Sequence, residues 1–371
     1  MTHAAVVSLH PQRSESPGLW TLAWRRFWRD RVGLASLAVV LLFFGLMVAS
    51  GLGLVAADWS REVGVFYAPP TFVVSKGSEQ TGAAPESSRG AKAGENPVDP
   101  LADVLSQIRG KPSSGDDTGI VDPLADVLAE IRSAEAGMGP RAEARSPTLP
   151  FGGDRWGRDV LKKTIKGTQT SMFVGLMAAA LTALLGTVFG ALAGYYGRWV
   201  DDFFNWFYSI FTAVPYLLLI LAIAAVLNQK GTMTVILILG LTGWTGIFRL
   251  VRAEYLKHKV REYIQAADAI GASHARRMFV HILPNVSHVV LVQLSLHVVL
   301  FIKSEVVLSF LGFGVGVDTV SWGSMLNEAQ AELILGYWWQ LAAATIAMAA
   351  LVTAFSLFTD ALRDALDPKL K

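Results

Sequence analysis

Cysteine is absent from this sequence of 371 residues. Disulfide bonds, nucleophilic thiolates and cysteine-ligated metal centres are therefore excluded as sources of stability or chemistry. Charged side chains are also scarce, at 17% of residues, against about a quarter in ordinary soluble domains. Hydrophobic residues make up 52% of the chain. This composition is typical of a membrane protein rather than of a soluble globule.

The few charges are clustered, and long uncharged stretches separate the clusters. Each stretch has room for one bilayer-spanning helix of about 20 apolar residues, although the fourth only just does. Five are bounded by Arg31 and Asp58, Lys166 and Arg198, Asp202 and Lys230, Lys230 and Arg249, and Glu332 and Asp360. A sixth, mostly apolar stretch runs from Val286 to Gly312. We therefore predict an all-α membrane protein with six transmembrane helices.

The first apolar stretch runs from Val32 to Ala57 and follows several arginines, as the core of a secretory signal does. It is longer than the roughly 7–15 residues of a cleavable core. We interpret it as a retained transmembrane helix rather than as a signal cleaved near Ala57.

The basic residues predict the orientation of the helices, because short cytoplasmic loops carry an excess of Lys and Arg. They gather before the first span, after the second, between the fourth and fifth, and after the sixth. The alternate short loops hold Lys230 alone or, between Gly312 and Glu332, no basic residue. Both termini are thus expected in the cytoplasm and the long first loop outside, since long loops cross the membrane regardless of charge.

These expectations divide the chain into five parts. They are a cytoplasmic N-terminal segment (1–31), a first transmembrane helix (32–57), an extracytoplasmic loop (58–166), a transmembrane core (167–360) with a cytoplasmic loop (253–285), and a cytoplasmic tail (361–371).

The outer loop holds an insertion from Ser75 to Ala144 that is rich in Gly, Ser, Pro, Ala and charge, a composition that predicts little order. Within it, DPLADVLSQIR from Asp99 returns as DPLADVLAEIR from Asp122. Each copy reads as a short amphipathic helix with Asp as N-cap. The repeat is either a duplication that only packs locally or a docking element for an external partner. We favour the first, because two such repeats cannot build a solenoid core.

Small and polar residues mark two of the spans. Gly186, Gly190 and Gly194 are spaced by four in the second span, a pattern that predicts close contact with another helix. In the fifth span, Gln293 and His297 are one turn apart and share a face.

The same span carries Lys303 and Glu305, which lie about 200° apart around a helix and are not expected to pair. Ionisable groups at membrane depth usually face the bundle or a wet cavity. Alternatively, Lys303 and Glu305 lie near the outer end and reach water. Gln293, His297 and Glu305 are our candidates for a translocation path or gate.

No catalytic motif is evident. The chain contains neither a GxxxxGK[ST] phosphate loop nor an HExxH zinc motif, and its seven histidines are scattered. We expect no catalysis and no metal site, so any energy used by this protein comes from another subunit.

The longest polar cytoplasmic run extends from Arg261 to Asn285. Ile264, Ala267 and Ile270 fall at i, i+3 and i+6, which predicts a small helix with an apolar stripe that ends at Gly271.

Ser273 can then cap a second helix that runs to Leu283, and Pro284 would open the next membrane helix. A small projecting helix suits insertion into a groove on a partner. Periodicity alone favours the alternative, an ordinary cytoplasmic loop with interfacial helices.

"AADAIG" from Ala266 to Gly271 and "HILPN" from His281 to Asn285 resemble the EAA signature of ATP-binding-cassette (ABC) importer permeases. Gln265 replaces the usual Glu, and His281 stands at the nominal Ile.

Further blocks are similar, in the same order, to the C-type permease subunits of the dipeptide/oligopeptide (peptide/nickel) branch. They are "GRDVL" (Gly157 to Leu161), "AGYYGRWVDD" (Ala193 to Asp202), "LTGWTGIFRLVR" (Leu241 to Arg252), "EVVLSFLGFG" (Glu305 to Gly314), "SWGSML" (Ser321 to Leu326) and "DALRDALDPK" (Asp360 to Lys369). The resemblance spans the chain from about Phe151 to its end. It implies the six-helix type I ABC importer permease fold, with a long extracytoplasmic insertion after the first helix.

The resemblance also implies roles for residues. A coupling helix that docks on an ATPase subunit would comprise Gln265, Ala266, Ala267, Ile270, Gly271, Ala272 and Ser273. Its support would come from Arg261, Glu262, Leu283 and Pro284.

The implied assembly lies in a bacterial inner membrane. It contains a homologous second permease, two ABC ATPase subunits that hold ATP and Mg²⁺, and an extracytoplasmic peptide-binding protein. This chain itself would bind no cofactor and no nucleic acid.

Two alternatives stay open. The cargo could be nickel or another small solute, or the chain could be a membrane scaffold or signalling subunit that moves nothing. A stand-alone secondary transporter fits less well, because the spans lack an evident inverted repeat and a clear midplane ion site.

Overall fold

The computed structural model describes residues 24–73, 145–316 and 318–366. Over these ranges the regular structure is helical, and β pairing is limited to isolated bridges between segments 62–70 and 146–158 and to one bridge between Gly153 and Asp159. The insertion with its repeats at Asp99 and Asp122 lies outside the described residues, as do most of the N-terminal segment and the end of the tail.

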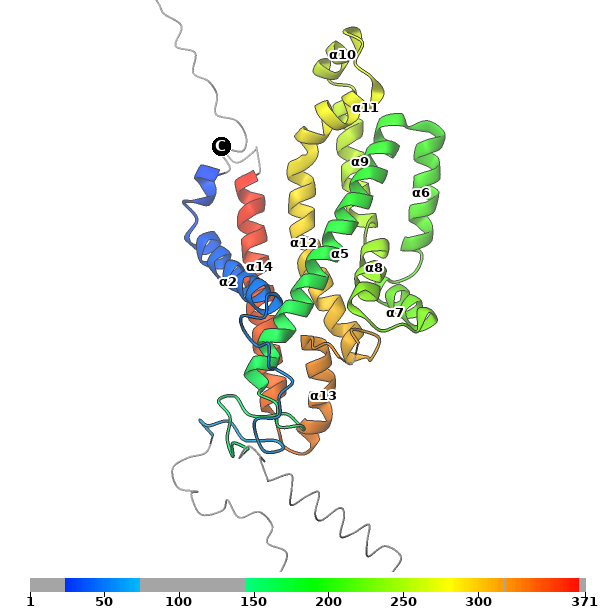
Figure 1. Ribbon diagram of the computed structural model, residues 1–371. Helices are drawn as coiled ribbons and strands as arrows, with labels where there is room; N and C mark the ends of the chain where they lie inside the picture. The colour runs from blue at the N-terminus through cyan, green and yellow to red at the C-terminus, as the bar shows by residue number, and fades with distance from the viewer. Residues whose placement is uncertain (1–23, 74–144, 317, 367–371) are drawn as a thin grey trace, which may run out of the picture.

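The helices form an elongated bundle, with α10 projecting at one end and α13 at the other (Figure 1). The start of α2 and the end of α14 lie toward the α10 end (Figure 1). The elements are α2 (Arg31–Gly51), α5 (Val160–Tyr196), α6 (Arg198–Thr212), α7 (Tyr216–Leu227), α8 (Thr232–Thr242), α9 (Thr245–Lys259), α10 (Glu262–Ala269), α11 (His274–Arg276), the π-helix η1 (Arg277–Ile282), α12 (Leu283–Phe310), α13 (Trp322–Ile334) and α14 (Trp339–Leu366).

Within the described part, five helical runs are long and apolar enough to cross a membrane. They are α2, α5, α8 with α9, α11 through α12, and α14. A sixth crossing results if α6 and α7, which meet at 83°, are counted as one broken span. Pro215 stands immediately before α7, where its missing N–H and fixed φ interrupt the helix. The six predicted crossings correspond to these five runs and the bent pair.

Three boundaries differ from the sequence prediction. Helix α2 ends at Gly51 rather than near Ala57, and α14 continues past Asp360 to Leu366. Helix α5 begins at Val160, before the charges that we took as the end of the outer loop. The side chain of Asp159 caps it by accepting the Leu161 N–H at 2.8 Å. A helix can extend beyond its apolar part wherever its charged side chains find partners.

The fifth predicted span also differs. Ser273 caps α11 as expected, but the helix does not stop at Leu283. It continues from His274 to Phe310 through η1, with Pro284 in the first turn of α12. Pro284 cannot donate to the carbonyl four residues earlier, and the wider π-helical turn accommodates this loss. The part of the predicted cytoplasmic loop that follows His274 and the membrane helix are therefore one continuous helical run.

The glycines of α5 confirm the predicted close contact, because they lie against α9. A Cβ atom added at Gly186 would come within 2.9 Å of the Trp244 carbonyl oxygen. At Gly190 the same atom would come within 2.9 Å of the carbonyl oxygen of Phe248. Backbone atoms cannot move aside as a side chain can, so only glycine permits this approach.

We expect Gly190→Leu to destabilise the protein strongly, because the added side chain must push α5 away from α9. Overpacking of this kind costs roughly 1–3 kcal/mol. The measurement is the fraction of detergent-solubilised protein that stays monodisperse after heating. Gly45→Leu in α2 is the matched control, since nothing lies within 4 Å of a Cβ there. Equal heat resistance of the two variants would contradict the packing role.

Candidate functional site

Helix α10 stands on its own at the end of the bundle, between α9 and α11 (Figure 1). It buries Ile264 and Ala267, which are 4% and 6% exposed. Ile264 belongs to a cluster that includes Tyr255 of α9 and Met278 of η1. Ile270 leaves the predicted stripe. Because the helix ends at Ala269, the Ile270 side chain turns outward and is 85% exposed. The element thus has one face fixed to the bundle and an apolar tip in solvent.

The chain reverses after α10 through a glycine. Gly271 has φ +79°, which residues with a side chain rarely adopt, and its N–H donates to the Asp268 carbonyl oxygen at 2.9 Å. The N–H of Ala272 donates to the Ala267 carbonyl oxygen at 3.0 Å. These hydrogen bonds give partners to carbonyl oxygens in the last turn of α10, as in other helices that end at a glycine. The turn is compact and points the tip of α10 away from the membrane spans.

One ion pair fixes α10 to η1, and further polar contacts join the helices behind it. The guanidinium of Arg277 forms an ion pair with Asp268 at 2.5 Å, and the Arg277 side chain is only 11% exposed. Nδ1 of His274 lies 3.0 Å from both the Tyr195 hydroxyl of α5 and Nη2 of Arg277. The Tyr255 hydroxyl donates to the Met278 carbonyl oxygen at 3.0 Å. Only the Arg277–Asp268 pair reaches α10 itself, and the other contacts join α5 to α11 and α9 to η1. A force on the tip of α10 would therefore pass through Arg277 into η1, and from there to the helices that η1 and α11 contact.

The structure brings the predicted coupling residues into one element and divides them between two faces. Gln265, Ala266, Gly271 and Ser273 are exposed, Ala272 is half-buried, and Ala267 packs inward. The predicted supporting residues lie at the start of α10 and, further along the chain, at the start of α12. Arg261 is the N-cap of α10, Glu262 is in its first turn, and Leu283 and Pro284 open α12.

The predicted path residues do not form one site. His297 of α12 is 9% exposed, and its Nδ1 lies 2.7 Å from the Gln293 carbonyl oxygen. Gln293 lines a cavity of about 330 Å³ between α9, α12 and α14, and His297 is not among the residues that line it. Glu305 lies three turns further along α12 and is completely buried.

Glu305 connects three helices. Its carboxylate oxygens accept hydrogen bonds from the Ser171 hydroxyl of α5 and the Ser309 hydroxyl, each at 2.6 Å. Ser171 in turn accepts the backbone N–H of Trp322, at the start of α13, at 3.2 Å. Lys303 is exposed, so the predicted lack of pairing between these two residues is confirmed. Glu305 joins α5, α12 and α13 rather than lining a channel within this chain.

Sequence reasoning missed a buried charged network at the α13 end. Lys163 of α5 is fully buried, and its Nζ lies 2.8 Å from Asp154 and 2.5 Å from Glu328 of α13. It also donates to Oε1 of Gln340 in α14 at 3.2 Å. Burying the ammonium would be costly without these partners. One signal was present in the sequence, since Glu328 and Glu332 share a helix face and no basic residue lies nearby in α13.

Glu332, near this network, is a buried carboxyl group with one oxygen that lacks a hydrogen-bond partner. Only 2% of the residue is exposed, Oε1 accepts the Arg155 N–H at 3.2 Å, and Oε2 has no hydrogen-bond partner. Burial raises the pKa of this carboxyl to about 7, although the nearby charge of Lys163 opposes the shift. In the described part of the chain, no group of three or more His, Asp and Glu side chains could hold a metal ion.

The sequence of this chain matches a known protein family. The sequence profile described as "Binding-protein-dependent transport system inner membrane component" matches residues 186–371, which include α10 and α13. The chain is 38% identical over 221 residues to the dipeptide transport system permease protein DppC of Bacillus subtilis, covering 60% of this chain and 69% of the relative.

Two other relatives are similar. Identity is 37% over 221 residues to the oligopeptide transport system permease protein OppC of Bacillus subtilis, covering 60% of this chain and 72% of that one. Identity to the oligopeptide transport system permease protein OppC of Haemophilus influenzae is 33% over 219 residues, which cover 59% of this chain and 70% of that protein.

The raised pKa of Glu332 predicts a pH-dependent stability. Its folded-state pKa of about 7 exceeds the ordinary value of 4.5, so the folded protein holds this proton more tightly than the unfolded chain. The contribution is full below about pH 4.5 and is lost as the pH rises through about 7. We expect the thermal unfolding midpoint to fall between about pH 5 and about pH 8, by a few degrees more in the wild type than in Glu332→Gln. Glu262→Gln, at an exposed position, should behave like the wild type. Identical pH profiles for Glu332→Gln and the wild type would contradict the assignment.

Proposed function

The chain belongs to the family of binding-protein-dependent transport system inner membrane components, and from this premise we propose that it is the C-type permease subunit of an ATP-driven peptide importer. It is a multi-pass inner membrane protein with the all-α type I permease fold of that family. The peptide cargo is supported by the names of its relatives, which are dipeptide and oligopeptide transport permeases.

The observation that carries the coupling role is the two-faced geometry of α10. A transmitting element needs an exposed contact surface and a rigid connection to the parts that move. Ile270 provides the first, being 85% exposed, and the ion pair between Asp268 and the largely buried Arg277 side chain provides the second. An apolar tip on a short projecting helix suits a groove on a partner protein. We assign this groove to a cytoplasmic ATPase subunit, which binds the ATP and Mg²⁺.

This assignment gives the protein an orientation and a mechanism. The α10 end faces the cytoplasm together with both termini, and α13 faces outside. Closure of two ATPase subunits around ATP would move α10. Arg277, which pairs with Asp268 of α10, lies in the run His274–Phe310, so the α12 part of that run would carry the movement into the membrane. This movement would shift the equilibrium between the inward-open and outward-open states of the permease. The size of the shift is limited by the difference between the affinities of the ATPase subunits for the two states.

A second, homologous permease completes the assembly, and an extracytoplasmic binding protein delivers the peptide. The cavity that Gln293 lines includes neither His297 nor Glu305, and Glu305 is completely buried. We therefore place the path between the two permeases.

Ile270→Glu should weaken the association with the ATPase subunits by about tenfold or more, because a charge would replace an apolar anchor at the contact. Co-purification of the ATPase subunits and peptide uptake in proteoliposomes measure this. Ile334→Glu is the control, since Ile334 is 87% exposed at the opposite end, in α13. Undiminished ATPase binding by Ile270→Glu would refute the docking assignment.

Uptake by the reconstituted complex tests the cargo. We expect ATP-dependent accumulation of labelled di- to hexapeptides when the cognate binding protein is present, and no accumulation of ⁶³Ni²⁺. Import of nickel without peptide would replace the proposed substrate. ATPase activity that never responds to a loaded binding protein would favour a scaffold.

A further inference from the structure

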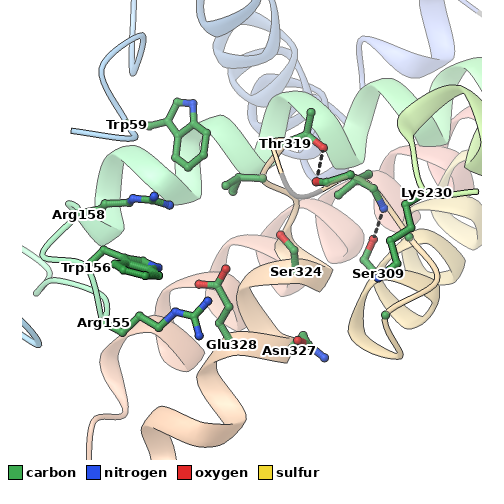
Figure 2. A pocket seen from close by; sticks show the side chains of 15 residues that line it. Trp59, Arg155, Trp156, Arg158, Lys230, Ser309, Thr319, Ser324, Asn327 and Glu328 are labelled. Carbon is green, nitrogen blue, oxygen red and sulfur yellow. Dashed lines mark hydrogen bonds between the residues drawn. The ribbon is translucent and has the colours of Figure 1, made fainter. Parts of the chain in front are cut away.

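A cavity of about 380 Å³ lies at the α13 end of the bundle. Its walls are Trp59, the segment just before α5, the loop after α12, and α13 (Figure 2). Pockets that hold small ligands usually measure about 300–1,000 Å³ and combine apolar walls with a few converging polar groups. The apolar walls here are the rings of Trp59 and Trp156.

The charges that face the cavity are unbalanced. Arg155, Arg158 and Lys230 line it, and none of the ion pairs formed among the described residues includes them. Figure 2 places the two arginines on one side and Lys230 on the other. The one acidic side chain of the lining, Glu328, is already bound by Lys163 at 2.5 Å. The cavity therefore presents three cations to whatever enters it.

The two arginines are positioned before any ligand arrives. The guanidinium carbon of Arg158 lies 5.5 Å from the ring centroid of Trp59 and 5.8 Å from that of Trp156. That of Arg155 lies 5.2 Å from the Trp156 ring. Oδ1 of the buried Asp154 accepts the backbone N–H groups of Trp156 and Arg158 at 2.8 and 2.9 Å, which fixes the turn that carries them.

Arg158 also has an unused donor. Its Nε is buried and has no hydrogen-bond partner in the structure. A buried donor left without a partner is costly, and a carboxylate is the partner that a guanidinium fork matches best. The guanidinium of Arg158 would match an anionic oxygen ligand, while the tryptophan rings would pack against the apolar part of the same ligand.

We propose that this cavity binds the terminal carboxylate of a peptide after its release from the binding protein. Arg158 contacts the carboxylate through its guanidinium, Lys230 adds charge from the opposite side, and the tryptophans accommodate the last side chain. This inference rests on the proposed function and extends it to a peptide-binding site within the permease itself. The C-terminal carboxylate is common to peptides of every sequence, so such a site would tolerate varied cargo.

The test uses the assembled transporter in nanodiscs without the binding protein. The probes are trialanine labelled at its N-terminus with fluorescein and the same peptide with a C-terminal amide, and fluorescence anisotropy reports binding. We expect the acid to bind about tenfold or more tightly than the amide, as a charge-assisted contact predicts. Arg158→Gln and Lys230→Gln should each weaken binding of the acid and leave binding of the amide unchanged, and Arg158→Lys should recover part of the loss.

The control is Lys162→Gln, which removes a nearby charge that pairs with Asp58 at 2.7 Å and does not line the cavity. It should bind the acid as the wild type does. Equal affinity of the wild type for acid and amide would overturn the proposal, as would unchanged acid binding in Lys230→Gln and Arg158→Gln. An equal loss for acid and amide in Arg158→Gln would mean that the side chain only supports the tryptophans.

Two further outcomes separate this inference from the proposed function. If the variants bind the probe normally but need more binding protein for half-maximal uptake, the cations contact the binding protein instead, and the peptide site is refuted. If the wild-type complex imports trialanine and the variants import it with the same KM, the proposed function stands and only this inference fails. If the wild type imports no peptide at all, the proposed function itself fails.

Discussion

The free-energy cost of removing a charge from water determines where charged side chains lie in this protein. Charged side chains are scarce in the apolar spans, and the buried Glu305 is enclosed by hydroxyl donors from α5 and from its own helix. The remaining charges gather at the two ends of the bundle, and both candidate sites lie there. At one end, Arg277 and Asp268 fix α10. At the other, Lys163 is enclosed by Asp154 and Glu328 beneath the cationic cavity.

Helix α5 connects these two ends. Its first turn holds Lys163 in the buried network, and its last turn places the Tyr195 hydroxyl beside His274. A helix of 37 residues extends over roughly 55 Å. The glycines at 186, 190 and 194 let α9 lie along it at backbone distance. Movement of α10 would therefore reach both α5 and α12, which are joined again at Glu305 through Ser171. The same contacts that stabilise the bundle provide a continuous physical connection between its ends.

Periodic and chemical patterns in the sequence predicted much of the projecting element around α10. Gly271 and Ser273 were assigned their turn and cap correctly, because such local geometry depends on a few adjacent residues. Ile270 was misplaced, since a stripe at i, i+3 and i+6 assumes that the helix continues, and α10 ends one residue earlier. Pro284 was read as a break, yet η1 absorbs the missing hydrogen bond and leaves a single long run. The stretch that forms α6 and α7 was predicted as one spanning helix, although Pro215 marks a bend between the two.

The sequence by itself determined the membrane class, the crossings and the projecting helix, because hydropathy, charge clustering and turn residues act over short distances along the chain. Only the tertiary structure decided which polar residues meet. Lys163 and Gln340 are 177 positions apart, and Ser171 and Glu305 are 134 apart. The cavity likewise combines Trp59, Arg158 and Lys230 from separate segments. Such meetings depend on how whole helices pack, and the packing is set by the sum of many weak contacts that no local pattern records.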